Sequence, residues 1–149
     1  MTTVLLLIGL WLVFNLSAPY AVLLRAQPIS WGRLPMELLT SETDRKVRFC
    51  MTKLTGGYGY SVWSPLGLNL VVFDKGFFAH ARPDLIRFVI AHELGHFHQN
   101  HHKKRWVAIV TGLVLIPAVR RWLLRMEDDA DVEATKRTQF TRNMFPELL

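Results

Sequence analysis

The sequence predicts an α+β protein in which a mainly helical domain with a small β-sheet follows an N-terminal transmembrane helix. Three observations lead to this fold class. The first 25 residues are almost entirely apolar, short β-branched and aromatic runs lie between residues 58 and 73, and apolar residues recur with helical spacing after Pro83. With 149 residues, the chain is long enough for one domain with a modest core. We therefore expect an anchor over residues 1–25 and a folded domain over residues 26–149.

Composition limits the classes of partner. Hydrophobic residues make up 50% and charged residues 20% of the chain, which excludes a disordered protein. The formal net charge of +6 suits either nucleic acid or an anionic membrane surface. Because no helix-turn-helix, zinc-finger or RNA-binding aromatic motif is present, we expect contact with membrane lipid and no nucleic-acid partner. Cys50 is the only cysteine, so the chain has no internal disulfide framework.

The apolar leader from Val4 to Leu24 contains no charged residue. As a helix it would rise about 31 Å, close to the bilayer core of about 30 Å. No Lys or Arg precedes it, whereas a cleaved signal peptide has a positive N-terminal region, so we expect a retained anchor. Basic residues such as Arg25 and Arg33 follow it, and the positive-inside rule then places the next domain in the cytoplasm. The sequence thus predicts an integral membrane protein with a single N-terminal span.

Between the leader and Pro83, the sequence predicts a surface helix and two strands. Met36 to Phe49 is interpreted as the helix, with Thr40 or Ser41 as its cap. Residues 58–63 are expected to pair with a β-branched and aromatic run that consists of Asn69, Leu70, Val71, Val72 and Phe73. We expect this second run to be an edge strand, along which an extended substrate pairs backbone to backbone.

The helix that follows carries the most informative motif of the chain. It is expected to begin near Pro83, which suits a first helical position. His92, Glu93 and His96 form an H-E-x-x-H motif, and residues four apart lie on the same face of a helix. Both imidazoles can then bind one tetrahedral zinc ion, while the glutamate acts as general base toward a water. The motif therefore predicts a zinc-dependent peptidase.

A catalytic zinc site requires a third protein ligand, and the sequence offers two candidates. His102 would serve in the pattern H-E-x-x-H-x-x-G-x-x-H, but that pattern needs a glycine where this chain has Gln99. Because glutamine favours a continuing helix, His102 would be carried past the metal. The histidines beside it at positions 98 and 101 are interpreted, with His102, as a polar and cationic helix end.

Glu127 is the second and favoured candidate. Together with Leu123 and Asp131, it falls on one helical stripe that faces inward. Burying two carboxylates is unfavourable unless each meets a cation or a donor. Zinc would satisfy Glu127, and Asp131 would accept the free ring N–H of a ligating histidine and so hold its tautomer.

The order of these motifs resembles a known group of enzymes. H-E-x-x-H followed by E-x-x-A-D is similar to the gluzincin peptidases, and more narrowly to the HtpX-like and CAAX-prenyl-type membrane metallopeptidases. The similarity runs from Phe73 to Ala134 and is closest over Phe88–His96. It implies a zincin-like domain with one Zn²⁺ per chain, in which His92, His96 and Glu127 are the ligands and Glu93 is the general base.

A second apolar segment runs from Trp106 to Val119, between two basic clusters. As a helix it would reach about 21 Å, which is too short to cross a bilayer. A complete crossing there would also separate His92 and His96 from Glu127. The segment is therefore expected to be either a membrane-apposed or re-entrant element, with a bend at Gly112 and Pro117, or a core helix.

These expectations combine into one function with two alternatives. The chain is expected to be a membrane-anchored zinc-dependent endopeptidase that hydrolyses a protein or peptide substrate with metal-activated water. A soluble ImmA/IrrE-like peptidase that cleaves a repressor, and a catalytically inactive zinc-stabilised membrane adaptor, remain alternatives. The candidates for stabilising the oxyanion are Tyr58, Tyr60, His80 and Arg137.

Overall fold

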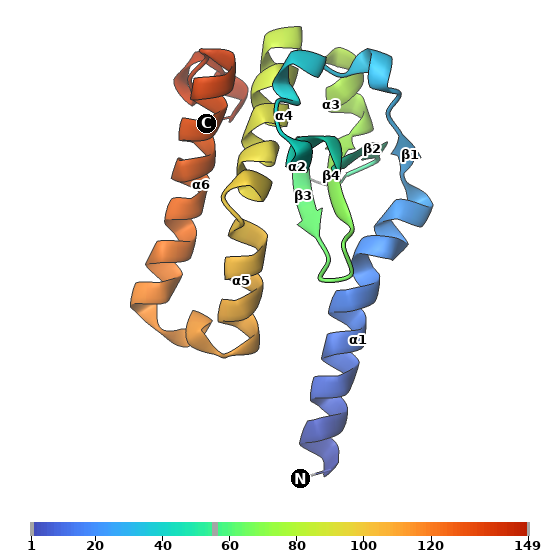
Figure 1. The fold of residues 1–149 in the computed structure, drawn as a ribbon, viewed down its shortest axis with the longest axis vertical. Helices are drawn as coiled ribbons and strands as arrows, with labels where there is room; N and C mark the ends of the chain where they lie inside the picture. The colour runs from blue at the N-terminus through green and yellow to red at the C-terminus, as the bar shows by residue number, and fades with distance from the viewer. Residues whose placement is uncertain (1, 55–56, 149) are drawn as a thin grey trace.

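The computed structural model describes residues 2–54 and 57–148 and places a small sheet between helices on both of its faces (Figure 1). The helices are α1(Thr2–Arg25), α2(Glu42–Arg45), α3(Lys75–His80), α4(Pro83–His98), α5(His101–Val110) and α6(Pro117–Thr138). The strands are β1(Gln27–Pro28), β2(Arg48–Thr52), β3(Gly59–Trp63) and β4(Asn69–Asp74). The predicted class, a mainly helical α+β domain with a small sheet, is confirmed.

The sheet has the order β1-β2-β4-β3, so β4 is an interior strand. It pairs in parallel with β2 and antiparallel with β3. The antiparallel pair confirms the predicted partnership of residues 58–63 with Asn69–Phe73, but the expected edge position of Asn69–Phe73 is wrong. Because β4 is hydrogen-bonded on both sides, its backbone has no free row of groups to offer a peptide. Among the described residues, the edge next to it is β3.

Side chains of β4 alternate between two apolar layers. Val71 and Phe73 pack toward Phe88 of α4 in the main core. Leu70 and Val72 lie on the opposite face, where they pack against Cys50 and the C-terminal end of α1. The four central residues of β4 are 0% exposed, as expected for a strand covered on both faces.

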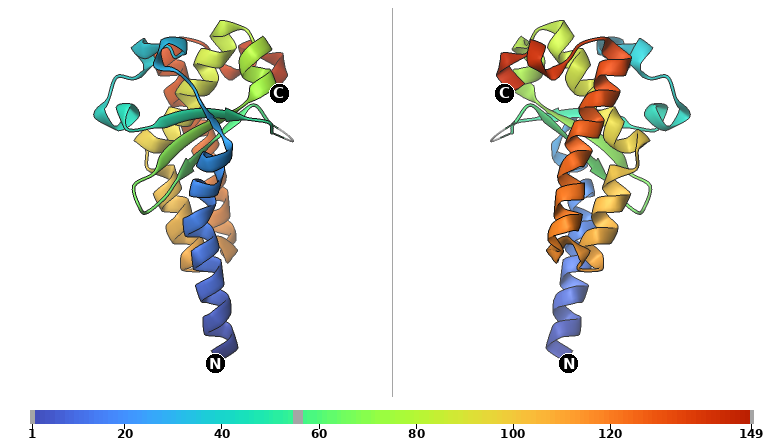
Figure 2. Two further views of the ribbon diagram at one scale, coloured as in Figure 1. Left: turned by 90° about the vertical axis from the view of Figure 1, so that its right-hand side faces the viewer. Right: turned by 90° about the vertical axis from the view of Figure 1, so that its left-hand side faces the viewer.

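The leader forms one helix, α1, whose N-terminus projects away from the sheet (Figures 1 and 2). Over the described part of the chain, no helix combines the length and the apolar character that a membrane crossing needs. The transmembrane span predicted for residues 1–25 therefore has no support from the structure.

The single surface helix predicted over Met36–Phe49 is wrong. A 3-10 turn over Met36–Leu38 is followed by the short α2 and then by β2. Ser41 does cap α2, because its hydroxyl accepts from the Asp44 backbone N–H and the Asp44 carboxylate accepts from the Ser41 N–H, both at 3.0 Å. The helix ends after one turn because the following segment pairs with β4.

The second apolar segment forms a helical hairpin between α5 and α6. The chain reverses at Gly112, which adopts φ 73°, and α6 begins at Pro117, so the predicted bend is confirmed. Val107, Ile109 and Leu115 of this segment are exposed. Ala108 of the same segment is buried against Leu123 and Met126 of α6, so the choice between a membrane-apposed element and a core helix stays a prediction.

Candidate metal centre

Helix α4 positions the two motif histidines. Pro83 occupies its first turn, where backbone N–H groups have no partner within the helix, so a proline there costs no hydrogen bond. Leu85, Phe88 and Val89 bury one side of the helix in the core. One to two turns later, His96 is 5% exposed and Glu93 is 7% exposed. Packing of α4 in the core therefore fixes His96 and Glu93 in largely buried positions.

Helix α6 packs along α4, and Gly95 permits this close approach. A Cβ at position 95 would lie 3.2 Å from the Glu133 Cβ and 3.3 Å from the Ala130 Cα. Ala130 is itself small and fully buried. Glu127 and Asp131 flank this contact on α6, so the pair of small residues brings both carboxylates to the histidines.

Three ligand-type atoms converge between the two helices, from His92, His96 and Glu127. The two imidazole Nε2 atoms are 3.2 Å apart, and each lies 3.5 Å from the Glu127 Oε2. Ligand atoms on a tetrahedral zinc ion, with bonds of about 2.0–2.1 Å, are separated by about 3.3–3.4 Å. The three atoms thus have the spacing of one face of a zinc coordination tetrahedron.

Asp131 orients the first histidine. Its Oδ1 lies 2.7 Å from the His92 Nδ1, so His92 donates through Nδ1 and turns Nε2 toward His96 and Glu127. Burial lowers the pKa of His92, but the hydrogen bonds to Asp131 and Glu127 outweigh it and raise the pKa to about 9 when no ion is bound. For the Asp131 carboxyl, burial acts in the direction of a higher pKa. The hydrogen bond from His92 outweighs it, so the pKa of Asp131 is lowered overall.

His101 contacts the second histidine from behind. Its Nδ1 lies 3.0 Å from the His96 Nδ1, and the side chain is 1% exposed. Its Nε2 is buried and has no hydrogen-bond partner within the described residues. Burial, followed by the charge of His96, lowers the pKa of His101 to about 4, so this imidazole is neutral at pH 7. The interpretation of position 101 as part of a polar, cationic helix end is wrong, because this imidazole is buried and neutral.

Glu127 also meets a cation. Arg105 of α5 donates to its Oε1 at 2.9 Å, which leaves Oε2 directed at the two histidines. Hydrogen bonds from His92 and His96 hold the pKa of the Glu127 carboxyl far below its usual range. The carboxylate is therefore ionised, as a metal ligand must be.

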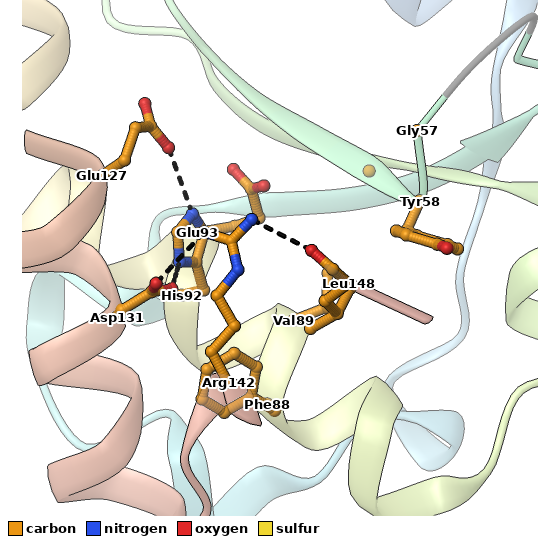
Figure 3. A pocket seen from close by; sticks show the side chains of 11 residues that line it. Gly57, Tyr58, Phe88, Val89, His92, Glu93, Glu127, Asp131, Arg142 and Leu148 are labelled. Atoms are coloured by element: carbon orange, nitrogen blue, oxygen red, sulfur yellow. Dashed lines mark hydrogen bonds and ion pairs between the residues drawn. The ribbon is translucent and has the colours of Figure 1, made fainter. Parts of the chain in front are cut away.

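A cavity of about 280 Å³ opens beside this cluster (Figure 3). Its lining comprises Gly57, Tyr58, Gly59, Phe88, Val89, His92, Glu93, Glu127, Asp131, Arg142 and Leu148. Tyr58 lies across the cavity from the His92–Glu93 pair (Figure 3). Arg142 donates to the Asp131 Oδ2 at 3.2 Å and to the Leu148 carbonyl at 3.0 Å. Sequence reasoning missed Arg142, because it follows the end of α6 and belongs to no spaced motif.

The other candidates lie elsewhere. His102, the alternative third ligand, is hydrogen-bonded through Nε2 to the Ser61 hydroxyl oxygen at 3.1 Å and is not part of the ligand cluster. Helix α4 does break before it, at Asn100 with φ 56°, a conformation that asparagine tolerates. Arg137 is buried in ion pairs with Asp44 and Glu133, which leaves it unavailable to a substrate oxyanion.

More than half of the chain, residues 64–144, matches the sequence model of peptidase family M48. The matched region contains β4, α4 and α6, and with them every residue of the three-atom cluster. A search of curated proteins found no match to this sequence.

Proposed function

Because the chain belongs to peptidase family M48, we propose that it is a membrane-anchored, zinc-dependent endopeptidase. The observation that carries the proposal is the convergence of His92, His96 and Glu127 at separations of 3.2, 3.5 and 3.5 Å. Two imidazoles and one carboxylate from two helices are a donor set of catalytic zinc sites, which leave a further position for water or substrate. Structural zinc sites, by contrast, use four protein ligands.

The side chains around the cluster prepare it for a cation. Asp131 and His101 accept the ring N–H groups of the two ligating histidines, so both Nε2 lone pairs face the ion. A zinc ion held in this way supplies Lewis acidity, which acidifies a water and polarises a carbonyl. Arg105 and Arg142 offset the negative charge of Glu127 and Asp131.

Glu93 is the proposed general base. It follows His92 on α4, lines the cavity and is 7% exposed. A carboxylate in that place can take a proton from the attacking water and deliver it to the leaving amine. His92 and Glu93 thus divide the work, since the first holds the ion and the second moves the proton.

The substrate is proposed to lie along the free edge of β3. The Tyr58 carbonyl accepts from the Asp74 N–H and the Ser64 N–H donates to the Leu68 carbonyl, both across to the β4 side. Alternate residues of an antiparallel strand direct their backbone groups to opposite sides. The backbone groups of Gly59, Ser61 and Trp63 therefore point away from β4, where an extended peptide can pair with them. Gly59 also lines the cavity that holds Glu93.

Membrane anchoring is proposed from the sequence of α1, which has no charged residue before Arg25. Extraction of membranes with alkaline carbonate tests it. An anchored protein stays in the pellet, whereas release by high salt alone would favour the soluble, repressor-cleaving type of peptidase.

Catalysis is tested by Glu93→Gln, which removes the proton acceptor and keeps the shape of the side chain. We expect this variant to bind one equivalent of zinc and to lose cleavage of an unstructured protein substrate by at least about a hundredfold. Asp128→Asn, which changes an exposed carboxylate next to Glu127 in the sequence, is the control and should keep full activity. Undiminished cleavage by Glu93→Gln would show that Glu93 is not the base. Zinc binding with no cleavage by the unmodified protein would identify the inactive adaptor.

A further inference from the structure

The turn between α5 and α6 exposes an unusual number of large apolar side chains. Leu115 is 84% exposed and Leu124 is 64% exposed, and Val107, Leu113, Ile116 and Trp122 are exposed as well. Exposed apolar side chains gathered at one turn of a folded domain mark a site of protein or membrane contact. We refer to these six residues as the turn surface.

A groove of about 380 Å³ lies within the turn surface. It is lined by Val107, Ala108, Leu113, Val119 and Trp122, together with Lys103 and Lys104. Lysine side chains combine an apolar stem with a charged end, so these two extend the apolar lining to a basic rim. The groove therefore pairs an apolar floor with positive charge.

Charge on this part of the chain has one sign. No Asp or Glu occurs from Phe97 to Met126. The basic residues of the same stretch are Lys103, Lys104, Arg105, Arg120, Arg121 and Arg125. Arg105 pairs with Glu127, whereas no described residue forms an ion pair with any of the other five. An anionic surface would supply the missing partners.

The turn surface lies at the same end of the molecule as the N-terminus of α1. In Figures 1 and 2, α1 and the α5–α6 hairpin both extend from the sheet in one direction. The N-terminal part of α1 reaches beyond the hairpin in both figures, so a bilayer that takes up this part of α1 would present its surface to the turn. A nucleic acid would satisfy the cations but would offer no counterpart to Leu115 and Leu124, because its outer surface is a row of phosphates.

From these observations we infer that the α5–α6 turn docks on the surface of an anionic lipid bilayer. The turn surface inserts at the boundary of headgroups and acyl chains, and the lysines and arginines contact lipid phosphates. Docking of the turn requires neither zinc nor proteolysis. If the proposed peptidase function also holds, docking places Glu127 about 16 Å along α6 from Ile116, so the site would face segments of substrates close to the membrane.

The test must report contact of the turn itself with lipid, because α1 alone could hold the chain on vesicles. A label is therefore placed in the turn. An environment-sensitive fluorophore is attached to a Leu115→Cys variant in a Cys50→Ser background, and the full chain is mixed with vesicles of phosphatidylcholine and phosphatidylserine. Insertion of the turn into the apolar part of the bilayer should shift the emission of this label to shorter wavelength, and nitroxides on the acyl chains should quench it. The same label on Met144→Cys, which follows the far end of α6, should show neither effect.

The second test asks whether docking of the turn depends on its basic residues. Replacing both Arg120 and Arg121 with Gln should lower the equilibrium constant for docking of the labelled turn about 30-fold, as expected for two cations near an anionic surface. Neutralising Arg33 and Arg45, which are exposed outside the hairpin, should leave docking unchanged. Equal access of an aqueous quencher to labels at 115 and 144 in the presence of vesicles would overturn the inference. Shielding of the label at 115 by a DNA duplex and not by vesicles would also overturn it.

Discussion

The Nδ1 atoms of His96 and His101 lie 3.0 Å apart, and this contact sets the protonation of both rings. A histidine that binds zinc through Nε2 carries its proton on Nδ1, so His96 must donate and His101 must accept. The proton of His101 then sits on Nε2, where it is buried without a described partner. An unsatisfied buried N–H costs about 1–3 kcal/mol, which indicates that the contact serves the neighbouring ligand more than stability.

The first prediction concerns this acceptor. His101→Ala leaves the His96 N–H unpaired, so zinc affinity should fall by about 10–100-fold. His101→Asn, whose amide oxygen also accepts a hydrogen bond, should recover part of that loss. Competition with a chelator measures the affinity, and His98→Ala, on an exposed position of α4, is the control. Equal zinc affinity of His101→Ala and the unmodified protein would show that His101 does not support zinc binding.

Close packing of α4 on α6 leads to the second prediction. Gly95→Ala would place a methyl group 3.2–3.3 Å from Glu133 and Ala130 and push the helices apart. We expect a loss of about 1–3 kcal/mol in the free energy of unfolding, together with weaker zinc binding. Gly32→Ala, which meets nothing within 4 Å, should change neither. Chemical denaturation of the metal-free proteins measures the free energy of unfolding, and zinc titration measures the change in zinc binding.

Acid stability of the metal-free protein is the third prediction. Burial, followed by the charge of His96, lowers the pKa of His101 to about 4 and that of His102 to about 3. Histidine in an unfolded chain titrates near pH 6.5. The unfolded chain therefore takes up protons below pH 6.5 that the folded protein does not, and stability falls as the pH drops from 6.5 toward 4.

Urea denaturation should thus give a lower midpoint at pH 5 than at pH 6.5. His102→Gln should shrink the difference, whereas His80→Gln, at an exposed site on α3, should not. The pKa of His92 is raised to about 9, so its contribution is present in full below pH 6.5 and does not oppose this trend. A difference of the same size in the His102→Gln variant would contradict the assignment.

The fourth prediction addresses the free edge of β3. Ser61→Pro removes a backbone N–H that points away from β4, so pairing with an extended peptide is weakened while the pairs to β4 remain. We expect KM for a long peptide to rise and the zinc content to stay the same. Ser61→Ala, which removes only the hydroxyl that contacts His102, is the control for the side chain. An unchanged KM in Ser61→Pro would show that substrates do not use this edge.

Parts of the site that depend on the spacing of residues close together in the sequence could be predicted. Pro83 and the H-E-x-x-H pattern place a helix and two imidazoles without any tertiary information. Glu127 and Asp131 could be selected because two inward carboxylates on one stripe need partners, and both do lie against His92.

Features that depend on partners across the fold were not predictable in the same way. The parallel pairing of β2 with β4 joins segments about 20 residues apart, and it turns the expected edge strand into an interior one. The unbroken apolar run from Leu70 to Phe73 was the available signal, since such runs are typical of strands covered on both faces. For His101 no such signal existed, because its burial depends on the break of α4 at Asn100.

Zinc binding by the unmodified protein and by Glu127→Ala tests the central claim most directly. The unmodified protein should bind one zinc ion per chain, and Glu127→Ala should bind it at least about a hundredfold more weakly, because two imidazoles alone remain. Asp128→Ala, which removes the exposed carboxylate next in sequence, should bind zinc as tightly as the unmodified protein. Equal zinc affinity in Glu127→Ala and Asp128→Ala would contradict the proposed metal centre.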